Sequence, residues 1–277
     1  MIKLALFDLD KTLLDDSSRL PQEFDLYRQK LEEEGVKLGI ASARTFFSIA
    51  ELFGDRLDRL AGTCDNGNTI FDGNNFKVLN CWKEEDIRYL ISFVERDPDI
   101  GLVFSGTEEY YTDPLTVERL HSHGRGKLAA FVRDIEEAIS EGKQICNCHF
   151  VCFYEGYPSM QECVEEKLAG PLQELQENWD LMEAGWGWVA VCVPGEGKAA
   201  GIRSLMREYG AGREETMVFG DSDNDSSMFR EVKFSYAMKN ASESAKKAAG
   251  YITEEDNNHN GALKAALERT LAEKNRD

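Results

Sequence analysis

The sequence has no long apolar run and few basic residues for its size. Its mean hydropathy is −0.45, and no stretch approaches the ~18 consecutive apolar residues that a membrane-spanning helix needs. The apolar N-terminus reaches Asp8 too early for a signal peptide. Lys and Arg number 32 against 51 Asp and Glu, so the net charge is −19 at pH 7. A field of this sign repels nucleic acids and anionic membranes. We therefore expect neither as a partner, and a soluble, cytoplasmic protein.

Cysteine usage excludes a disulfide framework. The seven cysteines are odd in number and scattered through the chain. The densest group is Cys146, Cys148 and Cys152 with His149 beside it, and it lacks the second pair of ligands that a zinc site requires. We interpret it as a strand that buries small thiols on one face. The sequence also has no internal repeat and no low-complexity linker.

What the chain does contain is the alternation of a folded α/β protein. At ~150 residues per domain, 277 residues predict about two domains, and 42% hydrophobic with 30% charged residues is an ordinary folded composition. Near the N-terminus, strands alternate with helices, and the same alternation resumes after Lys198; this order is typical of parallel strands with right-handed crossovers. The expected strands are 2–8, 36–41, 60–64, 216–219 and 233–238, and the expected helices are 24–31, 45–53, 198–209 and 224–231.

The middle of the chain has a different pattern. Its strands come in hairpin-like pairs separated by helices, which favours an α+β module on an antiparallel sheet. The expected strands are 100–105, 109–112, 145–153, 179–184 and 187–193, and the expected helices are 84–96, 127–140 and 159–169. We therefore predict an α/β fold: a doubly wound, Rossmann-like parallel-sheet core, residues 1–81 and 191–277, interrupted by an inserted α+β cap domain, residues 82–190.

Polar groups follow three strands of the predicted parallel sheet. Asp8 and Asp10 come directly after the first strand, and Ser42 closes the second. The strand at 216–219 is followed by three carboxylates and an amide, Asp221 to Asp225, a set that suits a hard cation such as Mg²⁺. Taken alone, the first two patterns are more typical of an acidic turn and a serine N-cap, and the third also fits an exposed acidic turn. Because the carboxyl ends of parallel strands share one edge, their joint occurrence predicts a ligand site there.

Taken together, these motifs resemble the haloacid dehalogenase superfamily and, within it, the Cof-type phosphatases. The resemblance covers nearly the whole chain, and its specificity lies in the order and spacing of the motifs. The matching positions are Asp8-Leu9-Asp10-Lys11-Thr12 for DxDxT, Ser42 with Arg44, Asn66-Gly67, Lys198, Gly220-Asp221-x-x-Asn224-Asp225, Ala237-Met238-x-Asn240-Ala241 and the stretch Asp256 to Gly261. One departure is Lys11, since Cof-type members usually carry glycine there.

The resemblance implies a Mg²⁺-dependent phosphatase that forms an aspartyl-phosphate. Asp8 would be the nucleophile and Asp10 the general acid and base. Mg²⁺ would be held by the carboxylate of Asp8, the backbone carbonyl of Asp10 and the carboxylate of Asp221. Asp225 would also belong to the metal site, behind these direct ligands. The expected phosphate-binding groups are Leu9, Ser42, Ala43, Lys198 and Asn224.

The substrate is less well defined by the sequence. A small phosphorylated metabolite is the expected ligand, a sugar phosphate in the first instance. Arg44 either acts on the phosphate side or forms a structural ion pair. On the strand 145–153, Asn147 and His149 share one face with Ile145, Val151 and Phe153; these two polar residues either contact the leaving group or face water.

Three other functions remain open. A phosphomutase of the same superfamily would return the phosphoryl group to the substrate. A receiver-like module would be phosphorylated on aspartate as a signal, although such modules are about half this length and need no cap. A catalytically silent binding protein is disfavoured because every motif position is present.

Overall fold

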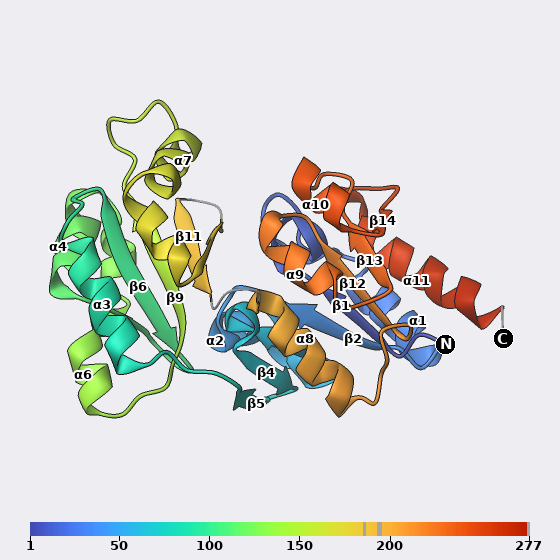
Figure 1. Ribbon diagram of the computed structural model, residues 1–277. Coiled ribbons are helices and arrows are strands. Elements are labelled where there is room, and N and C mark those ends of the chain that lie inside the picture. Colours follow the sequence, from blue (N-terminus) through green and yellow to red (C-terminus); the bar gives the residue numbers. More distant parts are fainter. Residues whose placement is uncertain (185–186, 193–195, 276–277) are drawn as a thin grey trace. The chain divides into compact units, whose positions relative to one another are not determined.

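The computed structural model describes residues 1–184, 187–192 and 196–275. The chain divides into two compact units (Figure 1). The first, which we call the core unit, contains Met1–Arg44, Ile49–Leu79 and Glu196–Asp277. The second, the inserted unit, contains Thr45–Ser48 and Asn80–Gly195. The fold is of the mixed α/β class, with a largely parallel sheet in the core unit.

In the core unit, eight described strands form one sheet. The strands from β14 to β3 run parallel, and β4 and β5 extend the sheet as an antiparallel hairpin. In spatial order they are β14 (Tyr251–Ile252), β13 (Phe234–Ala237), β12 (Thr216–Gly220), β1 (Leu4–Phe7), β2 (Lys37–Ala41), β3 (Ala61–Cys64), β4 (Thr69–Asp72) and β5 (Asn75–Val78).

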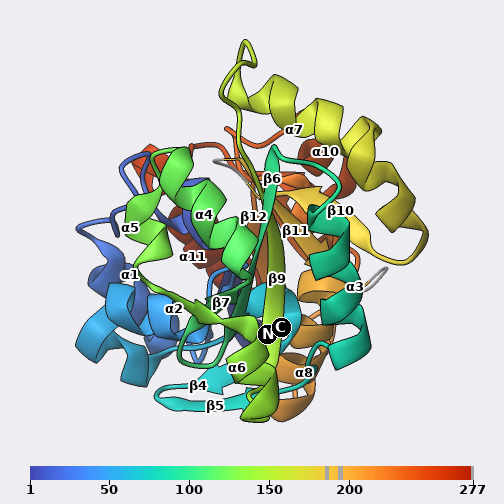
Figure 2. The same ribbon diagram turned by 90° about the vertical axis from the view of Figure 1, so that its left-hand side faces the viewer.

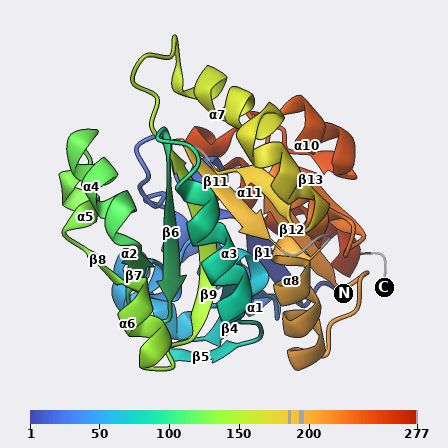
Figure 3. The ribbon, with the colours of Figure 1, turned by 60° about the vertical axis from the view of Figure 1, so that its left-hand side comes forward.

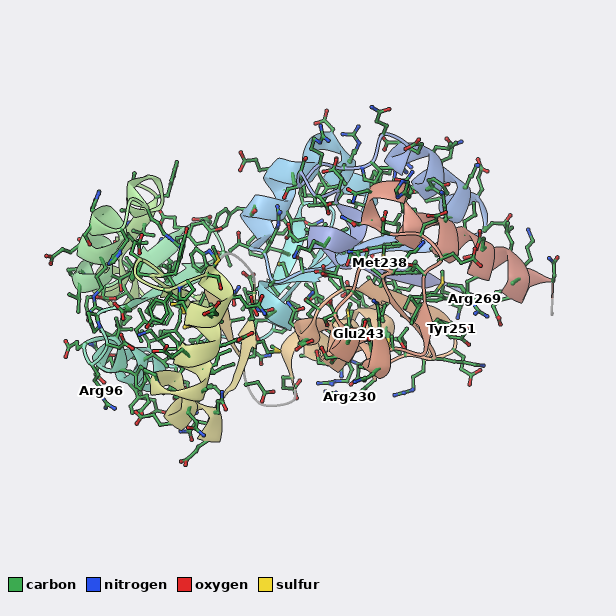
Figure 4. The ribbon with its side chains drawn as sticks, turned by 90° about the horizontal axis from the view of Figure 1, so that it is seen from above. Arg96, Arg230, Met238, Glu243, Tyr251 and Arg269 are labelled. Carbon is green, nitrogen blue, oxygen red and sulfur yellow. The ribbon has the colours of Figure 1, made fainter. Side chains whose placement is uncertain are left out.

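The central strands are apolar because both of their faces are covered. Every residue of β1 is buried, as parallel strands between helices require. Rings from four neighbouring strands stack in a row: Phe7 on Phe219 at 4.8 Å, Phe219 on Tyr236 at 4.8 Å and Tyr236 on Tyr251 at 5.0 Å. At the sheet edge, Arg269 lies beside Tyr251, with its guanidinium carbon 4.7 Å from the ring centre (Figure 4).

Helices complete the core unit. Within it, α1 packs against α11, and α8 packs against α9 and lies along β3. The helices are α1 (Phe24–Glu33), α2 (Phe46–Phe53, whose first residues belong to the inserted unit), α8 (Gly197–Glu208), α9 (Ser226–Phe229), α10 (Glu243–Ala248) and α11 (Gly261–Lys274), and the short helical turns are Leu9–Leu13, Gly54–Arg59, Asp65–Gly67, Asp223–Asp225 and Asn257–His259.

The inserted unit is built on a second, mostly antiparallel sheet (Figure 3). Its spatial order is β10 (Asp180–Glu183), β11 (Trp188–Cys192), β9 (Ile145–Cys152), β6 (Ile100–Gly106), β7 (Tyr110–Thr112) and β8 (Val132–Asp134). Its helices are α3 (Glu84–Val94), α4 (Pro114–Ser122), α5 (Gly126–Ala129), α6 (Ile135–Ser140) and α7 (Met160–Ala169), with a short helical turn at Pro171–Glu177.

Helices flank this sheet on both faces, with α3 and α4 on opposite sides of β6 and β9 (Figure 2). One cluster joins Cys148, Phe150 and Cys152 to buried residues of α3, α6 and α7. A second joins Val151 and Phe153 to Leu120 of α4. The thiols of Cys148 and Cys152 are thus buried on one face, as expected, and all seven cysteines of the chain are free.

Two expectations for this unit were wrong. The expected helix 127–140 is broken, because Val132–Asp134 forms strand β8 beside β7 and Asp134 then caps α6 by accepting from the N–H of Glu136 and Glu137. A register shift between Ser105 and Gly106 leaves Cys146 as an extra residue in β9. Ile145 therefore joins the cluster of Cys148, instead of the face of Asn147 and His149.

Two further observations concern the end of one expected strand and the length of the helices. The expected strand 187–193 is found as Trp188–Cys192, and Val193 lies outside the described residues. Within the described part of the chain, no helix is both long enough and apolar enough to cross a membrane.

Candidate active site

The register of the core sheet brings three strand ends to one edge. Phe7, the last residue of β1, lies opposite Phe219 of β12 and Ile40 of β2. The N–H of Asp8 continues this ladder by donating to the carbonyl of Phe219 at 2.9 Å. The residues that follow these strands, among them Asp8, Ser42 and Asp221, therefore share the carboxyl edge of the sheet.

Lys198 joins two carboxylates at this edge. Its Nζ donates to Oδ1 of Asp8 and to Oδ1 of Asp225, each at 2.6 Å. The ammonium group and Asp225 are fully buried, and Asp8 is only 7% exposed. Burial alone would lower the pKa of Lys198, but attraction to Asp225 and Asp8 raises it above its ordinary value. Lys198 is thus a cation at neutral pH, held against Asp8.

Asp225 uses both of its carboxylate oxygens within the protein. Oδ1 accepts from Lys198, and Oδ2 accepts from the backbone N–H of Asp221 at 2.9 Å and of Ser222 at 3.1 Å. The Ser222 side chain in turn bonds the N–H of Asp225, which forms a capping box around the turn Asp223–Asp225. Asp225 therefore fixes both the lysine and the segment that carries Asp221.

The three carboxylates of Asp8, Asp221 and Asp225 form a tight cluster. One oxygen from each lies within 4.8 Å of the other two. Burial raises the pKa of Asp8 to about 7 and that of Asp221 to about 8, and repulsion between the carboxylates adds to this effect. Attraction to Lys198 lowers both pKa values, but by less than burial raises them. Hard oxygen donors with excess negative charge are a donor set that Mg²⁺ prefers, so the residues present fit this ion.

Asp10 faces a different partner. Nε and Nη2 of Arg44 donate to its two carboxylate oxygens at 2.9 and 2.6 Å, a bidentate pair. The Asp10 side chain is half exposed, whereas the Arg44 side chain is about one quarter exposed. Asp10 is thereby held apart from the buried cluster of Asp8, Asp221 and Asp225, although it lies only two residues after Asp8.

The loop that follows β1 is pinned by distant parts of the chain. Lys11 has φ of 58°, a left-handed conformation that glycine adopts without cost, which accounts for the glycine usual at this position in Cof-type members. The carbonyl of Lys11 accepts from Nδ2 of Asn240 at 2.8 Å, and that of Leu14 from Nδ2 of Asn257 at 3.0 Å. The Oγ1 of Thr12 donates to Asp221 at 3.4 Å.

The expected phosphate-binding positions lie around the same edge. Ser42 is 2% exposed, and its Oγ accepts from the N–H of Arg44 at 3.1 Å. Asn224 is 7% exposed, and its Oδ1 accepts from Oγ of Ser222 at 2.7 Å. Leu9 is buried in the turn after Asp8, and Ala43 is half-buried in the loop after β2. The side chains of Ser42 and Asn224 are therefore held by neighbouring residues of their own loops.

Asn147 and His149 belong to the inserted unit. Asn147 is buried and accepts from the N–H of Cys148 at 3.1 Å. His149 is half-buried, with its ring centre 5.8 Å from that of Trp188 in an edge-on contact. Burial lowers the pKa of His149 to about 4, so the imidazole is neutral at pH 7. Asn147 therefore does not face water, whereas His149 keeps part of its surface exposed.

Sequence reasoning passed over several residues that shape the site. Thr12, Asn240 and Asn257 were quoted only as part of motifs, yet they bond Asp221 and the loop after β1. Asp65, next to the quoted Asn66-Gly67, is fully buried. An acid directly before an Asn-Gly pair at the end of a buried strand is the signal that could have drawn attention to it.

Comparison with known proteins decides the family. The sequence pattern of the haloacid dehalogenase-like hydrolases matches residues 5–265. The chain belongs to this family. Together with the curated relatives, that membership makes the protein a phosphohydrolase, which is what the resemblance of its motifs implied.

Relatives of this hydrolase match over nearly their whole length. The 5-amino-6-(5-phospho-D-ribitylamino)uracil phosphatase YbjI of Escherichia coli strain K12 is 24% identical, with 95% of this chain and 94% of that protein covered. The YcsE phosphatase of the same description from Bacillus subtilis strain 168 is 26% identical, with 95% and 94% covered. The solved structure of the subclass IIB sugar phosphatase BT4131 has a TM-score of 0.72 at 22% identity, with 96% and 98% covered. This last likeness shows a shared fold.

Proposed function

We propose that this hydrolase is a Mg²⁺-dependent phosphatase of a small phosphomonoester that acts through an aspartyl-phosphate on Asp8. The observation that carries the proposal is the position of Asp8, whose Oδ1 lies 2.6 Å from the ammonium of Lys198. A cation so placed offsets repulsion between the carboxylate and an anionic phosphate. Asp10 stands two residues further along, with its side chain half exposed.

In the first half of the reaction, a carboxylate oxygen of Asp8 attacks phosphorus. The bond between phosphorus and the ester oxygen breaks, and Asp10 gives its proton to the departing alcohol. The products of this step are the alcohol, the aspartyl-phosphate and an ionised Asp10.

In the second half, Asp10 takes a proton from water, and the water oxygen attacks the phosphorus of the aspartyl-phosphate. The bond between phosphorus and the Asp8 oxygen breaks, which releases inorganic phosphate and restores the carboxylate. Asp10 recovers the proton that it gave away, so the net reaction consumes one water.

The phosphate oxygens need donors that do not have to move during the reaction. The backbone N–H groups of Leu9 and Ala43, the hydroxyl of Ser42, the amide of Asn224 and Lys198 are the groups that we assign to them. The carboxylates of Asp8 and Asp221 and the carbonyl of Asp10 would hold Mg²⁺. When bound, this ion neutralises charge on the transferred phosphoryl group. We place Asp225 outside the ligand set, since both of its oxygens accept hydrogen bonds from protein donors.

The substrate class is a small phosphorylated metabolite, such as a sugar phosphate. We place the protein in the cytoplasm, with neither nucleic acid nor membrane as a partner. We assign Arg44 to the orientation of Asp10, and Asn147 with His149 to discrimination of the leaving group. The names of the ribitylaminouracil and sugar phosphatases among the relatives agree with a polyol or sugar phosphate.

The test is phosphate release from p-nitrophenyl phosphate and a panel of phosphomonoesters. Asp8→Asn keeps the side-chain volume but removes the nucleophile, so turnover should fall to background, and excess EDTA should do the same to the wild type. Asp223→Asn is the matched control, because Asp223 lies in the same segment as Asp221 but is exposed and accepts from Ser242 at 3.0 Å. A near wild-type rate for Asp8→Asn, or full activity in EDTA, would overturn the mechanism.

A phosphomutase is the rival with the same chemistry. It would need the phosphoryl group on Asp8 to return to a sugar instead of passing to water. Incubation with a sugar monophosphate and a bisphosphorylated activator distinguishes the two: a phosphatase releases inorganic phosphate, whereas a mutase yields an isomeric sugar phosphate.

A further inference from the structure

Asp65 is a buried carboxyl that the proposed mechanism does not use. Its side chain is completely buried at the end of β3. Oδ2 accepts from the thiol of Cys64 at 3.4 Å, and Oδ1 finds no hydrogen-bond partner among the described residues. The hydroxyl of Thr69, at the start of β4, also lies beside this carboxyl and acts on its ionisation. Asp65 thus contacts both strands that its turn connects.

The turn itself has an unusual backbone. Asp65, Asn66 and Gly67 have φ of 52°, 52° and 96°, three left-handed residues in succession. Aspartate and asparagine tolerate this region better than most residues, but each still adds strain that the surroundings must compensate. The conformation therefore depends on the contacts that hold the turn.

This turn contacts two loops of the active site. The N–H of Asp65 donates to the carbonyl of Arg44 at 2.9 Å, and the N–H of Asn66 donates to the carbonyl of Ser42 at 3.3 Å. Gly67 packs so tightly on Gly197, the residue before Lys198, that a Cβ at position 67 would collide with the Gly197 carbonyl. The turn 65–67 thus fixes both the Ser42–Arg44 loop and the start of α8.

The charged groups on the surrounding elements form ion pairs with residues other than Asp65. Arg44 binds Asp10, and Lys198 binds Asp8 and Asp225. The remaining charges nearby are Glu196 before α8, which pairs with Arg203, and Asp72 at the far end of β4, which pairs with Lys37. No described cation bonds Asp65, and an ionised carboxylate buried without a cation is strongly disfavoured.

We propose that Asp65 is a positioning residue of the phosphohydrolase reaction, whose neutral carboxyl holds the 65–67 turn and thereby the Ser42–Arg44 loop and Lys198. Burial raises the pKa of Asp65 to about 7, and the neighbouring hydroxyl of Thr69 and thiol of Cys64 only partly counteract this. Above that pH the carboxyl ionises without a partner, which loosens the turn and weakens phosphate binding. The kinetic part of this inference rests on the proposed roles of Ser42 and Lys198.

The first experiment needs no catalysis. Thermal unfolding of the wild type and of Asp65→Asn is measured from pH 4.5 to 8.5, with Asp55→Asn, an exposed carboxylate of the same unit, as control. A folded pKa above the unfolded one means that the wild type loses stability as pH rises toward about 7. The Tm of Asp65→Asn relative to the wild type should therefore rise up to about pH 7 and then level off. A difference that is constant across the range would overturn a neutral Asp65.

The second experiment measures kcat and KM for p-nitrophenyl phosphate with Mg²⁺ from pH 6 to 9. Asp65→Asn should keep kcat/KM within about two-fold of the wild-type value at pH 6.5. At alkaline pH, the kcat/KM of Asp65→Asn should fall less than that of the wild type. Asp65→Ala removes the contacts to both strands and should raise KM by about tenfold, since small displacements at an active site are costly. Equal losses for Asn and Ala, or an unchanged KM for Ala, would overturn the positioning role. A wild type without phosphatase activity would refute the proposed function, while the unfolding experiment would still decide the state of Asp65.

Discussion

Arg44 binds both carboxylate oxygens of Asp10, through Nε at 2.9 Å and Nη2 at 2.6 Å. A bidentate pair fixes the plane of the carboxyl group as well as its position. In the proposed mechanism, this orients the group that must protonate the leaving oxygen. The pairing also means that Arg44 acts on the reaction through another residue, which can be tested directly.

Arg44→Ala should lower kcat for an alkyl phosphate by about 10–100-fold, since a misdirected general acid loses much of its 10²–10⁴-fold contribution. If Arg44 acts through Asp10, then adding Arg44→Ala to Asp10→Asn should cost little more, which a double-mutant cycle measures. The control is Arg56→Ala, which removes an exposed pair with Asp25 at 2.9 Å in the same unit. Additive losses would show that Arg44 has a separate role at the phosphate.

Asp10→Asn should affect substrates according to their leaving group. Loss of the general acid should slow an alkyl phosphate by about 10²–10⁴-fold, whereas p-nitrophenolate leaves with little protonation and should be affected much less in the first step. The measurement is single-turnover release of each alcohol, which isolates that step from hydrolysis of the aspartyl-phosphate. Equal losses on both substrates would contradict the role as acid.

Lys11→Gly should stabilise the protein. Lys11 has φ of 58°, and a side chain there costs about 1 kcal/mol that glycine avoids, partly offset by the greater freedom of glycine in the unfolded chain. We expect a net gain of about 0.5 kcal/mol in the free energy of unfolding, read from urea denaturation. Lys30→Gly is the control, since Lys30 is exposed in the interior of helix α1 of the same unit and the same change there should destabilise.

His149 should make the protein sensitive to acid. Burial lowers the pKa of its imidazole to about 4, below the ordinary value near 6.5, so the unfolded chain binds the proton more tightly. This contribution to stability is complete above about pH 6.5 and is lost as the pH falls toward 4. The Tm of His149→Gln relative to the wild type should therefore rise on acidification from pH 7 to 4.5. An unchanged difference would contradict burial of the imidazole.

The strand-end residues could be predicted because a parallel sheet leaves few alternatives. Once the first, second and later strands are recognised, Asp8, Ser42 and Asp221 must lie on one edge, whatever the length of chain between them. The position of Lys198 came from family resemblance, since a lysine at a helix start is usually a solvated surface group. Its burial between Asp8 and Asp225 is a tertiary fact that no local pattern contains.

The errors lay where local signals conflict. The apolar spacing of residues 127–140 fits a helix, but Asp134 is a strong N-cap and pairing with β7 converts Val132–Asp134 into a strand. On β9, alternation fails at Cys146 because a bulge depends on the partner strand β6, which the sequence of β9 cannot report. The buried state of Asp65 likewise depends on packing between β3, β4 and α8.

The placement of β1 between β2 and β12 has a consequence for synthesis on the ribosome. Asp8 is made 190 residues before Lys198, and β12 comes later still. At about 5–20 residues per second, roughly 10–40 s pass before β1 can pair with β12. Asp8 waits about as long for the positive charge of Lys198. Most of the inserted unit, contiguous from Asn80, emerges in this interval and is complete first. The nascent enzyme therefore carries an unpaired, fully apolar strand edge for most of its translation, which is the stage at which it most needs protection from aggregation.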